Sequence, residues 1–297
     1  MPRKILVATD GSRGAQAAAR WAAVLAAACG ARMSLAHVLP ALPLALPDGM
    51  IFDRGAMEAM AAPALAAALA SLPPGAQADT RVLLGAAGER LAALAEEEAY
   101  DLIAVGRRGL NPLAQLIVGS VSGRVLQLAR CPVVVVQGLK TDGDFKEGSP
   151  MLRKVLLAVD GSPSSLAAAR WVAALAQHLP DLHVTAVTVV RDPRLAASTL
   201  AGAYIPTELM DPESLQAMGQ GVLDTARACL ADAVHDYDGR VLVGSAAEGI
   251  VQLAEEGGFD LIAMGRRGLN PIAQLVLGSV SERVVHLAPC PVVIVRD

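Results

Sequence analysis

Aromatic side chains are scarce in this chain of 297 residues, at 3% of its composition. Stacking on aromatic rings is a common way to hold single-stranded nucleic acid, so that mode of binding is disfavoured. Basic residues are not in excess either: 25 Lys and Arg stand against 29 Asp and Glu, and the net charge is -4. Because counterion release from nucleic acid needs a basic surface, we expect no nucleic-acid partner.

Long apolar runs are missing, although the mean hydropathy is +0.45. A membrane-spanning helix needs about 20 predominantly apolar residues. The nearest candidate, Ala15 to Cys29, is interrupted by Arg20. The first residues, Met-Pro-Arg-Lys, are followed by Asp10 without the apolar stretch of a signal peptide. These features predict a cytoplasmic protein with no membrane partner.

Several common chemical motifs are also absent. The four cysteines form no CxxC pair and no Cys/His cluster with zinc spacing, so we expect free thiols in a reducing compartment. The G-x-x-x-x-G-K-[ST] loop of Walker-type ATPases does not occur. No histidine has a triad partner at a recognisable spacing. The sequence therefore names no catalytic residue and no metal ligand.

What the chain does contain is a repeat. Residues 4–12 read KILVATDGS and residues 154–162 read KVLLAVDGS, so counterparts lie 150 positions apart. Residues 106–122 read GRRGLNPLAQLIVGSVS and residues 265–281 read GRRGLNPIAQLVLGSVS, where the offset is 159. The second copy is therefore nine residues longer. We place this insertion between about residues 190 and 239.

A stretch rich in Gly, Ser, Pro and charged residues separates the two copies and predicts a linker. The predicted domains are residues 1–139 and 151–297, joined by residues 140–150. The first copy alternates apolar runs with alanine-rich stretches. These predict strands near residues 4–9, 33–38, 80–84, 101–105 and 132–136, and helices near residues 13–29, 56–71, 88–98 and 120–129.

Continuously apolar runs, such as residues 133–136, suit a parallel sheet that is covered on both faces. The predicted fold class is α/β: two tandem, doubly wound domains, each with a five-stranded parallel sheet. We assume the strand order 3-2-1-4-5. In such a sheet ligands bind where the strand order reverses, at the carboxyl ends of strands 1 and 4.

The fourth strand of each copy leads into the pattern G-x2-G-x9-G-S. Its members are Gly106, Gly109, Gly119 and Ser120, and then Gly265, Gly268, Gly278 and Ser279. Glycines let backbone N–H groups approach a ligand, and a helix N-terminus attracts phosphate. Nearby arginines could add charge-assisted bonds. The structural alternative is a tight turn and, at Ser279 with Glu282, a capping box.

Asp10 and Asp160 each follow the first strand of their copy. One interpretation is that they and the serines two positions later cap the next helix. The other is that the carboxylate faces the crevice and contacts a ribose, a base amine or a phosphate-bound Mg²⁺. His37 ends the second strand, and at an offset of 150 the second copy has Val187 there, so we expect no shared role for this histidine.

Together these motifs resemble the universal stress protein family. They are similar to its ATP-binding branch, whose signature is G-x2-G-x9-G-[ST]. The Asp-Gly-Ser after the first strand and the Cys-Pro-Val-Val of the last strand also match. The resemblance covers nearly the whole chain outside the linker and looks like a tandem member. It implies the 3-2-1-4-5 order, ATP or another adenine nucleotide with Mg²⁺ at the switch point, and a role in stress tolerance or regulation.

The resemblance also implies nucleotide contacts in both copies. In the first copy they fall on Asp10, Val38, Gly106, Gly109, Gly119, Ser120, Val121 and Ser122, and we add Arg107 for its charge. In the second copy they fall on Asp160, Thr188, Gly265, Gly268, Gly278, Ser279, Val280 and Ser281, with Arg266 added. Thr9 against Val159, and Val38 against Thr188, are departures that predict unequal affinities.

Two alternative functions need features that this sequence lacks. An ATPase, or an ATP-dependent enzyme of the same fold, needs a base positioned near the phosphates, and the glycine loops offer none. A receiver-like signalling domain needs an acidic pair after strand 1 and a lysine after strand 5, and neither is present. We therefore expect a nucleotide-binding protein with little or no catalysis.

The last strand of each copy is apolar and lies at a sheet edge in the assumed order. Such edges pair readily with another strand, and the linker keeps the two copies at high effective concentration. We predict an intramolecular pseudo-dimer in which residues 133–136 pair with residues 292–295. A homodimer of chains is a further option.

Overall fold

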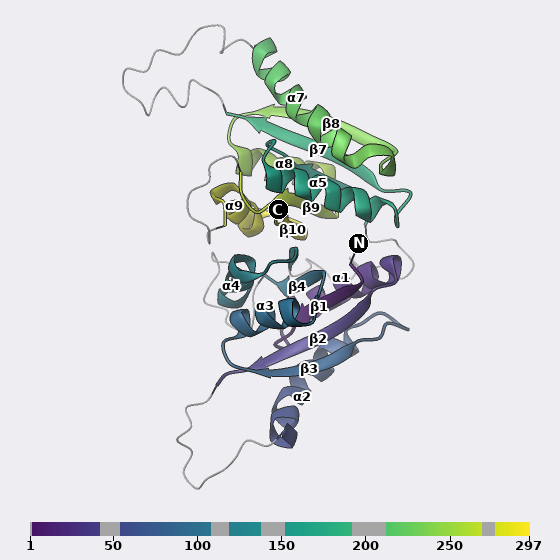
Figure 1. The fold of residues 1–297 in the computed structure, drawn as a ribbon, viewed down its shortest axis with the longest axis vertical. Coiled ribbons are helices and arrows are strands. Elements are labelled where there is room, and N and C mark those ends of the chain that lie inside the picture. Colours follow the sequence, from purple (N-terminus) through teal and green to yellow (C-terminus); the bar gives the residue numbers. More distant parts are fainter. Residues whose placement is uncertain (1, 42–53, 108–118, 138–151, 192–211, 269–276) are drawn as a thin grey trace, which may run out of the picture. The chain divides into compact units, whose positions relative to one another are not determined.

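The protein is represented by a computed structural model that describes residues 2–41, 54–107, 119–137, 152–191, 212–268 and 277–297 (Figure 1). The chain divides into two compact units, Met1–Met151 and Leu152–Asp297. The limits predicted for the linker lie outside the described residues. No helix in the described part of the chain is long and apolar enough to cross a membrane.

The first unit alternates strands and helices along the chain. Its elements are β1 (Lys4–Ala8), α1 (Arg13–Cys29), β2 (Arg32–Leu39), α2 (Arg54–Ala70), β3 (Asp79–Leu84), α3 (Ala87–Glu97), β4 (Leu102–Gly106), α4 (Ser120–Leu128) and β5 (Val133–Val136). Each observed strand and helix overlaps the element predicted for it. The agreement follows from the apolar runs, which are short and bounded by polar, Gly or Pro residues.

The second unit repeats this pattern. Its elements are β6 (Lys154–Ala158), α5 (Pro163–Ala176), β7 (His183–Val190), α7 (Pro212–Leu230), η2 (Ala231–Ala233), β8 (Asp236–Val243), α8 (Ala246–Gly257), β9 (Leu261–Gly265), α9 (Ser279–Leu287) and β10 (Val292–Val295). A short 3-10 turn, η2, follows α7.

The strands of each unit pair in parallel in the predicted order. The first unit runs β3-β2-β1-β4-β5 and the second runs β8-β7-β6-β9-β10, so the order 3-2-1-4-5 is confirmed in both. The central strands are fully buried: Ile5, Leu6 and Val7 expose 0% of their surface. Because β1 and β6 stand where the order reverses, the crevice of each unit opens beside their carboxyl ends.

Strand register corrects the alignment of the two copies. Lys4 pairs with Arg32, and its counterpart Lys154 pairs with His183, which makes the offset 151 along the second strand. His37 therefore corresponds to Thr188, and not to Val187 as the 150-residue offset predicted. One of the nine additional residues lies between α5 and β7, outside the interval that we predicted. The comparison of Val38 with Thr188 was wrong for the same reason.

The turn after the first strand of each unit leads directly into the next helix. Gly11 has φ +81° and Gly161 has φ +80°, values that favour glycine. The hydroxyl of Ser12 then accepts the N–H of Ala15 at the start of α1. Ser162 makes the same cap at the start of α5. The predicted capping role of these serines is thus present in both units.

Candidate functional site

A cavity of about 510 Å³ opens at the carboxyl ends of β6, β7 and β9 in the second unit. This volume lies within the range of about 300–1,000 Å³ that is typical of small-molecule sites. The predicted site residues that line it are Asp160, Thr188, Gly265, Gly268, Gly278, Ser279, Val280 and Ser281. The fold thus brings together side chains from three strands and one helix N-terminus.

The N-terminus of α9 forms one wall of the cavity. Gly278 is the N-cap, and its N–H donates to the carbonyl oxygen of Arg266 at 3.0 Å. The first N–H groups of a helix have no partner within the helix, and they carry a partial positive charge. A Cβ added to Gly278 would lie 3.2 Å from the carbonyl oxygen of Arg266. The glycine therefore allows the helix to begin close to the loop.

The predicted capping box between Ser279 and Glu282 is not formed. Gly278 holds the N-cap position, so Ser279 is N1 and Glu282 is N4, and each stands one position too far along the helix for a capping box. Ser281 is anchored instead: it is 3% exposed, and its hydroxyl donates to the carbonyl oxygen of Gly265 at 2.9 Å. This bond ties α9 to the end of β9.

Asp160 closes a turn and also lines the cavity, while its contact with a ligand stays a prediction. Its Oδ1 accepts the N–H of Ser162 at 3.0 Å and the hydroxyl of the same residue at 2.6 Å, which closes the turn after β6. The residue also lines the cavity. A Cβ added to Gly268 would lie 2.5 Å from Asp160 Oδ2. The start of the glycine loop therefore rests against this carboxylate.

The glycines at the ends of β4 and β9 have a structural reason of their own. A Cβ on Gly265 would lie 2.6 Å from the backbone carbon of Ser164, in the first turn of α5. A Cβ on Gly106 would lie 2.6 Å from the backbone carbon of Gly14, in the first turn of α1. The close contact between strand and helix is therefore sufficient to require glycine at these two positions, without any contribution from a ligand.

The two arginines after β9 differ in position. Arg267 lines the cavity, whereas Arg266, which we predicted as a contact, is not among its lining residues. Arg266 is 3% exposed, and burial lowers its pKa to about 10, with a further contribution from the positive charges of Arg296 and Arg267. Of the two arginines after β9, Arg267 is therefore the one whose charge is at the cavity.

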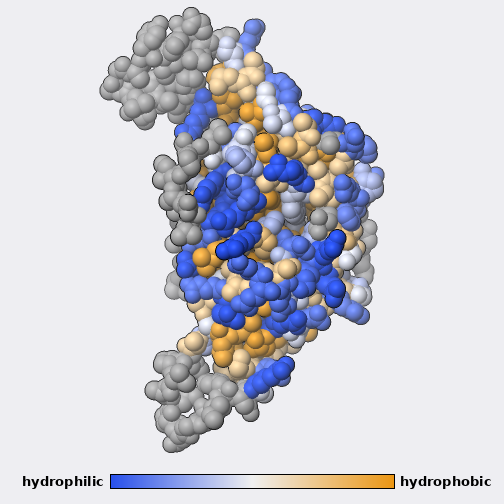
Figure 2. All heavy atoms as spheres, in the orientation of Figure 1, coloured by the Kyte–Doolittle hydropathy of each residue, from blue (hydrophilic) through white to orange (hydrophobic). Residues whose placement is uncertain are grey.

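The rest of the cavity wall was not predicted. Its apolar part includes Val189, Met218, Val222 and Ile250, and its polar part includes Ser165 and Arg191. Met218 on α7 is 56% exposed. Figure 2 shows apolar surface over the region of α7 and, separately, over that of α2 and β3. The predicted element ranges cover only the first copy, and no motif singled out these lining residues of the second.

The first unit has the corresponding turn after β1 and the corresponding hydrogen bonds at the start of α4. Asp10 Oδ1 accepts the N–H of Ser12 at 3.0 Å, and the N–H of Gly119 donates to the carbonyl oxygen of Arg107 at 3.0 Å. Ser122 is 2% exposed, and its hydroxyl donates to the carbonyl oxygen of Gly119 at 3.0 Å.

The other predicted contacts of the first unit are exposed, half-buried or outside the described residues. Ser120 and Val121 are exposed on the first turn of α4, and Val38 is half-buried near the end of β2. Gly106 ends β4. Gly109 lies outside the described residues.

His37 is a candidate that the misaligned repeat concealed. It occupies the position of Thr188, which lines the cavity of the second unit. The Nδ1 of His37 lies 2.8 Å from the carbonyl oxygen of Thr9. A carbonyl oxygen only accepts, so Nδ1 carries the hydrogen and Nε2 is the acceptor of the neutral ring. This histidine is thus held at the carboxyl edge of the first sheet.

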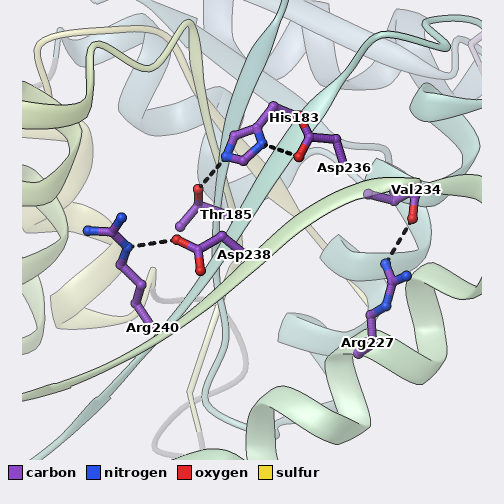
Figure 3. A network of polar contacts seen from close by, with 7 residues as sticks. All are labelled: His183, Thr185, Arg227, Val234, Asp236, Asp238 and Arg240. Atoms are coloured by element: carbon purple, nitrogen blue, oxygen red, sulfur yellow. Dashed lines mark hydrogen bonds and ion pairs between the residues drawn. The ribbon is translucent and has the colours of Figure 1, made fainter.

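A second polar cluster lies at the other end of the strands of the second unit (Figure 3). His183 contacts Asp236 through Nδ1 at 2.9 Å and Thr185 through Nε2 at 3.1 Å. His183 is the first residue of β7, whereas the cavity lies at the carboxyl end of this strand. The cluster therefore links β7 to β8 and is separate from the cavity.

No group of three or more His, Cys, Asp or Glu side chains among the described residues is arranged to hold a metal ion. The cavity of the second unit contributes the carboxylate of Asp160. Mg²⁺ is commonly bound through one or two carboxylates together with the phosphates of a nucleotide. The residues present therefore fit a magnesium ion that enters with a nucleotide.

Comparison with known proteins identifies the family. The profile of the universal stress protein family matches residues 1–137 and again residues 151–296. The chain belongs to the universal stress protein family. It is a tandem member, because two family domains follow each other in one chain. Each of these two matches contains one of the repeats described above.

Relatives of this universal stress protein have one or two domains. It is 36% identical to a universal stress protein of Thermus aquaticus over 151 residues, covering 49% of this chain and 100% of that protein. It is 28% identical over 305 residues to the universal stress protein Rv2623 of Mycobacterium tuberculosis, covering 99% and 96%. A crystal structure of a universal stress protein from Archaeoglobus fulgidus aligns with a TM-score of 0.64 at 20% identity, covering 99% of this chain and 98% of that one.

Proposed function

We propose that this universal stress protein binds ATP or another adenine nucleotide, with Mg²⁺, in the crevice of each repeat, and acts by binding with little or no catalysis. The observation that carries this proposal is the cavity of the second unit. It lies at the switch point of a doubly wound sheet, and the N-terminus of α9 forms part of its wall. Such a helix end attracts phosphate.

The cavity offers different surroundings to the two parts of a nucleotide. The N–H groups at the start of α9 and the guanidinium of Arg267 suit the phosphates. Val189, Met218 and Ile250 supply an apolar surface that suits a base. Aromatic residues are absent from the described lining, so the base would be held by aliphatic packing. Asp160 would meet the ribose or the magnesium ion.

Few groups in the cavity could act as a base in hydrolysis. Among the described lining residues, the ionisable side chains are Asp160, Arg191 and Arg267. An arginine stays protonated at neutral pH, which leaves the carboxylate of Asp160. Its Oδ1 already accepts two hydrogen bonds from Ser162. We therefore expect any turnover of ATP to be slow, below about 1 s⁻¹, the low end of dedicated enzymes.

Equilibrium dialysis of the full chain with ATP, with and without Mg²⁺, tests the proposal. We expect saturable binding that approaches two nucleotides per chain, and weaker binding of inorganic triphosphate, which lacks the base and ribose. Absence of binding at millimolar ATP contradicts the proposal. Equal binding of ATP and triphosphate would show that the apolar wall does not receive a base.

A further inference from the structure

Three buried serines hold the start of the loop that follows β9. Ser162, Ser164 and Ser165, here called the serine cluster, are 1%, 4% and 3% exposed. Ser162 is the N-cap of α5, and the other two lie in its first turn. The first repeat has Ser12, Gly14 and Ala15 at these positions. Two of the three hydroxyls are therefore specific to the second repeat.

Ser164 makes the shortest contact between the serine cluster and the loop. Its Oγ lies 2.6 Å from the carbonyl oxygen of Arg267, to which it donates. The Oγ of Ser162 lies 3.1 Å from the same oxygen, but it is also 2.6 Å from Asp160 Oδ1. A hydroxyl has one proton, and the charged carboxylate is the stronger acceptor. Ser164 is therefore the donor that satisfies this carbonyl.

Two successive carbonyls at the start of the loop tie two helix N-termini together. The carbonyl of Arg266 accepts the N–H of Gly278 at the start of α9. The carbonyl of Arg267 accepts the hydroxyl of Ser164 at the start of α5. Gly268, the next residue, rests against Asp160. The hydroxyl of Ser164 thus fixes the start of the loop between Asp160 and the N-terminus of α9, both of which line the cavity.

We propose that Ser164 is a positioning residue that presets the start of the loop, residues 266–268, for nucleotide binding in the second repeat. A site that is already arranged loses less conformational entropy when its ligand binds. The counterpart Gly14 has no side chain and cannot make this bond. It follows that the second repeat binds nucleotide more tightly than the first. This inference rests on the proposed function.

Titration of the full chain with ATP and Mg²⁺ by calorimetry tests the inference. We expect two affinities in the unmodified protein. Ser164→Ala should weaken the tighter one by about five- to tenfold, the size of one hydrogen bond to a neutral carbonyl. Ser164→Cys, whose thiol is a weaker donor, should give an intermediate loss. The melting temperature without nucleotide should change little in both variants, because α5 keeps its N-cap.

Ser71→Ala is the matched control. The hydroxyl of Ser71, in the first unit, donates to the carbonyl oxygen of Ala68 at 2.7 Å at the end of α2, and Ser71 is not among the predicted nucleotide contacts. Its loss should leave both affinities unchanged. If Ser164→Ala and Ser164→Cys both keep the tighter affinity within twofold, the inference is wrong, whether or not their stability falls. Failure of the proposed function is recognised separately, because the unmodified protein would then bind no ATP.

Discussion

The glycines of the signature are required for different structural reasons. Gly265 is required where β9 meets α5, whereas Gly268 lies beside Asp160 Oδ2 and Gly278 lies beside the carbonyl oxygen of Arg266. One G-x2-G-x9-G pattern therefore contains both a position fixed by helix packing and positions at the start of the loop and of α9 that line the cavity. Substitutions at these positions should separate the two effects.

Gly265→Ala should destabilise the protein in the absence of any ligand. The new Cβ would lie 2.6 Å from backbone atoms of Ser164 and Ser165, which cannot move without shifting α5. Overpacking of this kind costs about 1–3 kcal/mol. Gly221→Ala is the control: nothing lies within 4 Å, and alanine in the interior of α7 should add up to about 1 kcal/mol. Urea denaturation that shows equal stability for the two variants would contradict this account.

Gly268→Ala should impair nucleotide binding more than stability. Its Cβ would lie 2.5 Å from Asp160 Oδ2, a side-chain atom that can move aside. Moving this carboxylate disturbs the cavity, while the core of the unit stays intact. We expect one of the two nucleotides per chain to bind at least tenfold more weakly. Binding by calorimetry that is unaltered, together with a large loss of stability, would show that the loop glycine is structural.

The cysteines should differ in reactivity according to burial. Burial raises the pKa of the Cys131 thiol to about 11 and that of the Cys290 thiol to about 12. Alkylation proceeds through the thiolate, and a raised pKa leaves less of it at pH 8. Mass spectrometry after brief treatment with iodoacetamide should find Cys229 labelled ahead of both, and all four thiols labelled in denaturant. Rapid labelling of Cys290 in the folded protein would contradict its burial.

At the scale of elements, the pair β7 and β8 is linked by the polar cluster of Figure 3. The side chains of His183 and Asp236 are 28% and 71% exposed, so their contact is partly solvated. Exposed pairs contribute about 0.2–1 kcal/mol. Asp236→Ala should therefore lower stability by less than about 1 kcal/mol and leave nucleotide affinity unchanged. A change in affinity would mean that this end of the strands communicates with the cavity.

Most elements and their order could be predicted from the sequence, because each strand is an apolar run and each helix an alanine-rich stretch between breakers. The residues predicted as contacts in the second copy, Arg266 excepted, line one cavity, and their contact with a nucleotide stays a prediction. The position of His37 was missed, since a single additional residue before β7 shifts the repeat and only strand register reveals it. The residues that α7 and α8 contribute to the cavity wall could not be predicted, because they depend on how these helices pack and no sequence motif marks them.

At the scale of the whole molecule, the pairing of the final strands stays a prediction. Within its own unit, β5 pairs with β4 on one side, and β10 pairs with β9. If β5 and β10 pair with each other, the N–H groups on their outer sides are also hydrogen-bonded and exchange slowly. Residue-resolved hydrogen exchange should then show protection along Val133–Val136 and Val292–Val295 without alternation. Rapid exchange at alternate residues would contradict the intramolecular pseudo-dimer.

The central claim is that each repeat of this universal stress protein receives an adenine nucleotide at its carboxyl-edge crevice. A crystal structure of the full chain grown with Mg²⁺ and a non-hydrolysable ATP analogue tests it most directly. We expect the phosphates at the N-termini of α4 and α9, with the base of the second repeat against Val189 and Met218. A crevice that stays empty at millimolar analogue, or a nucleotide bound elsewhere, would contradict the account.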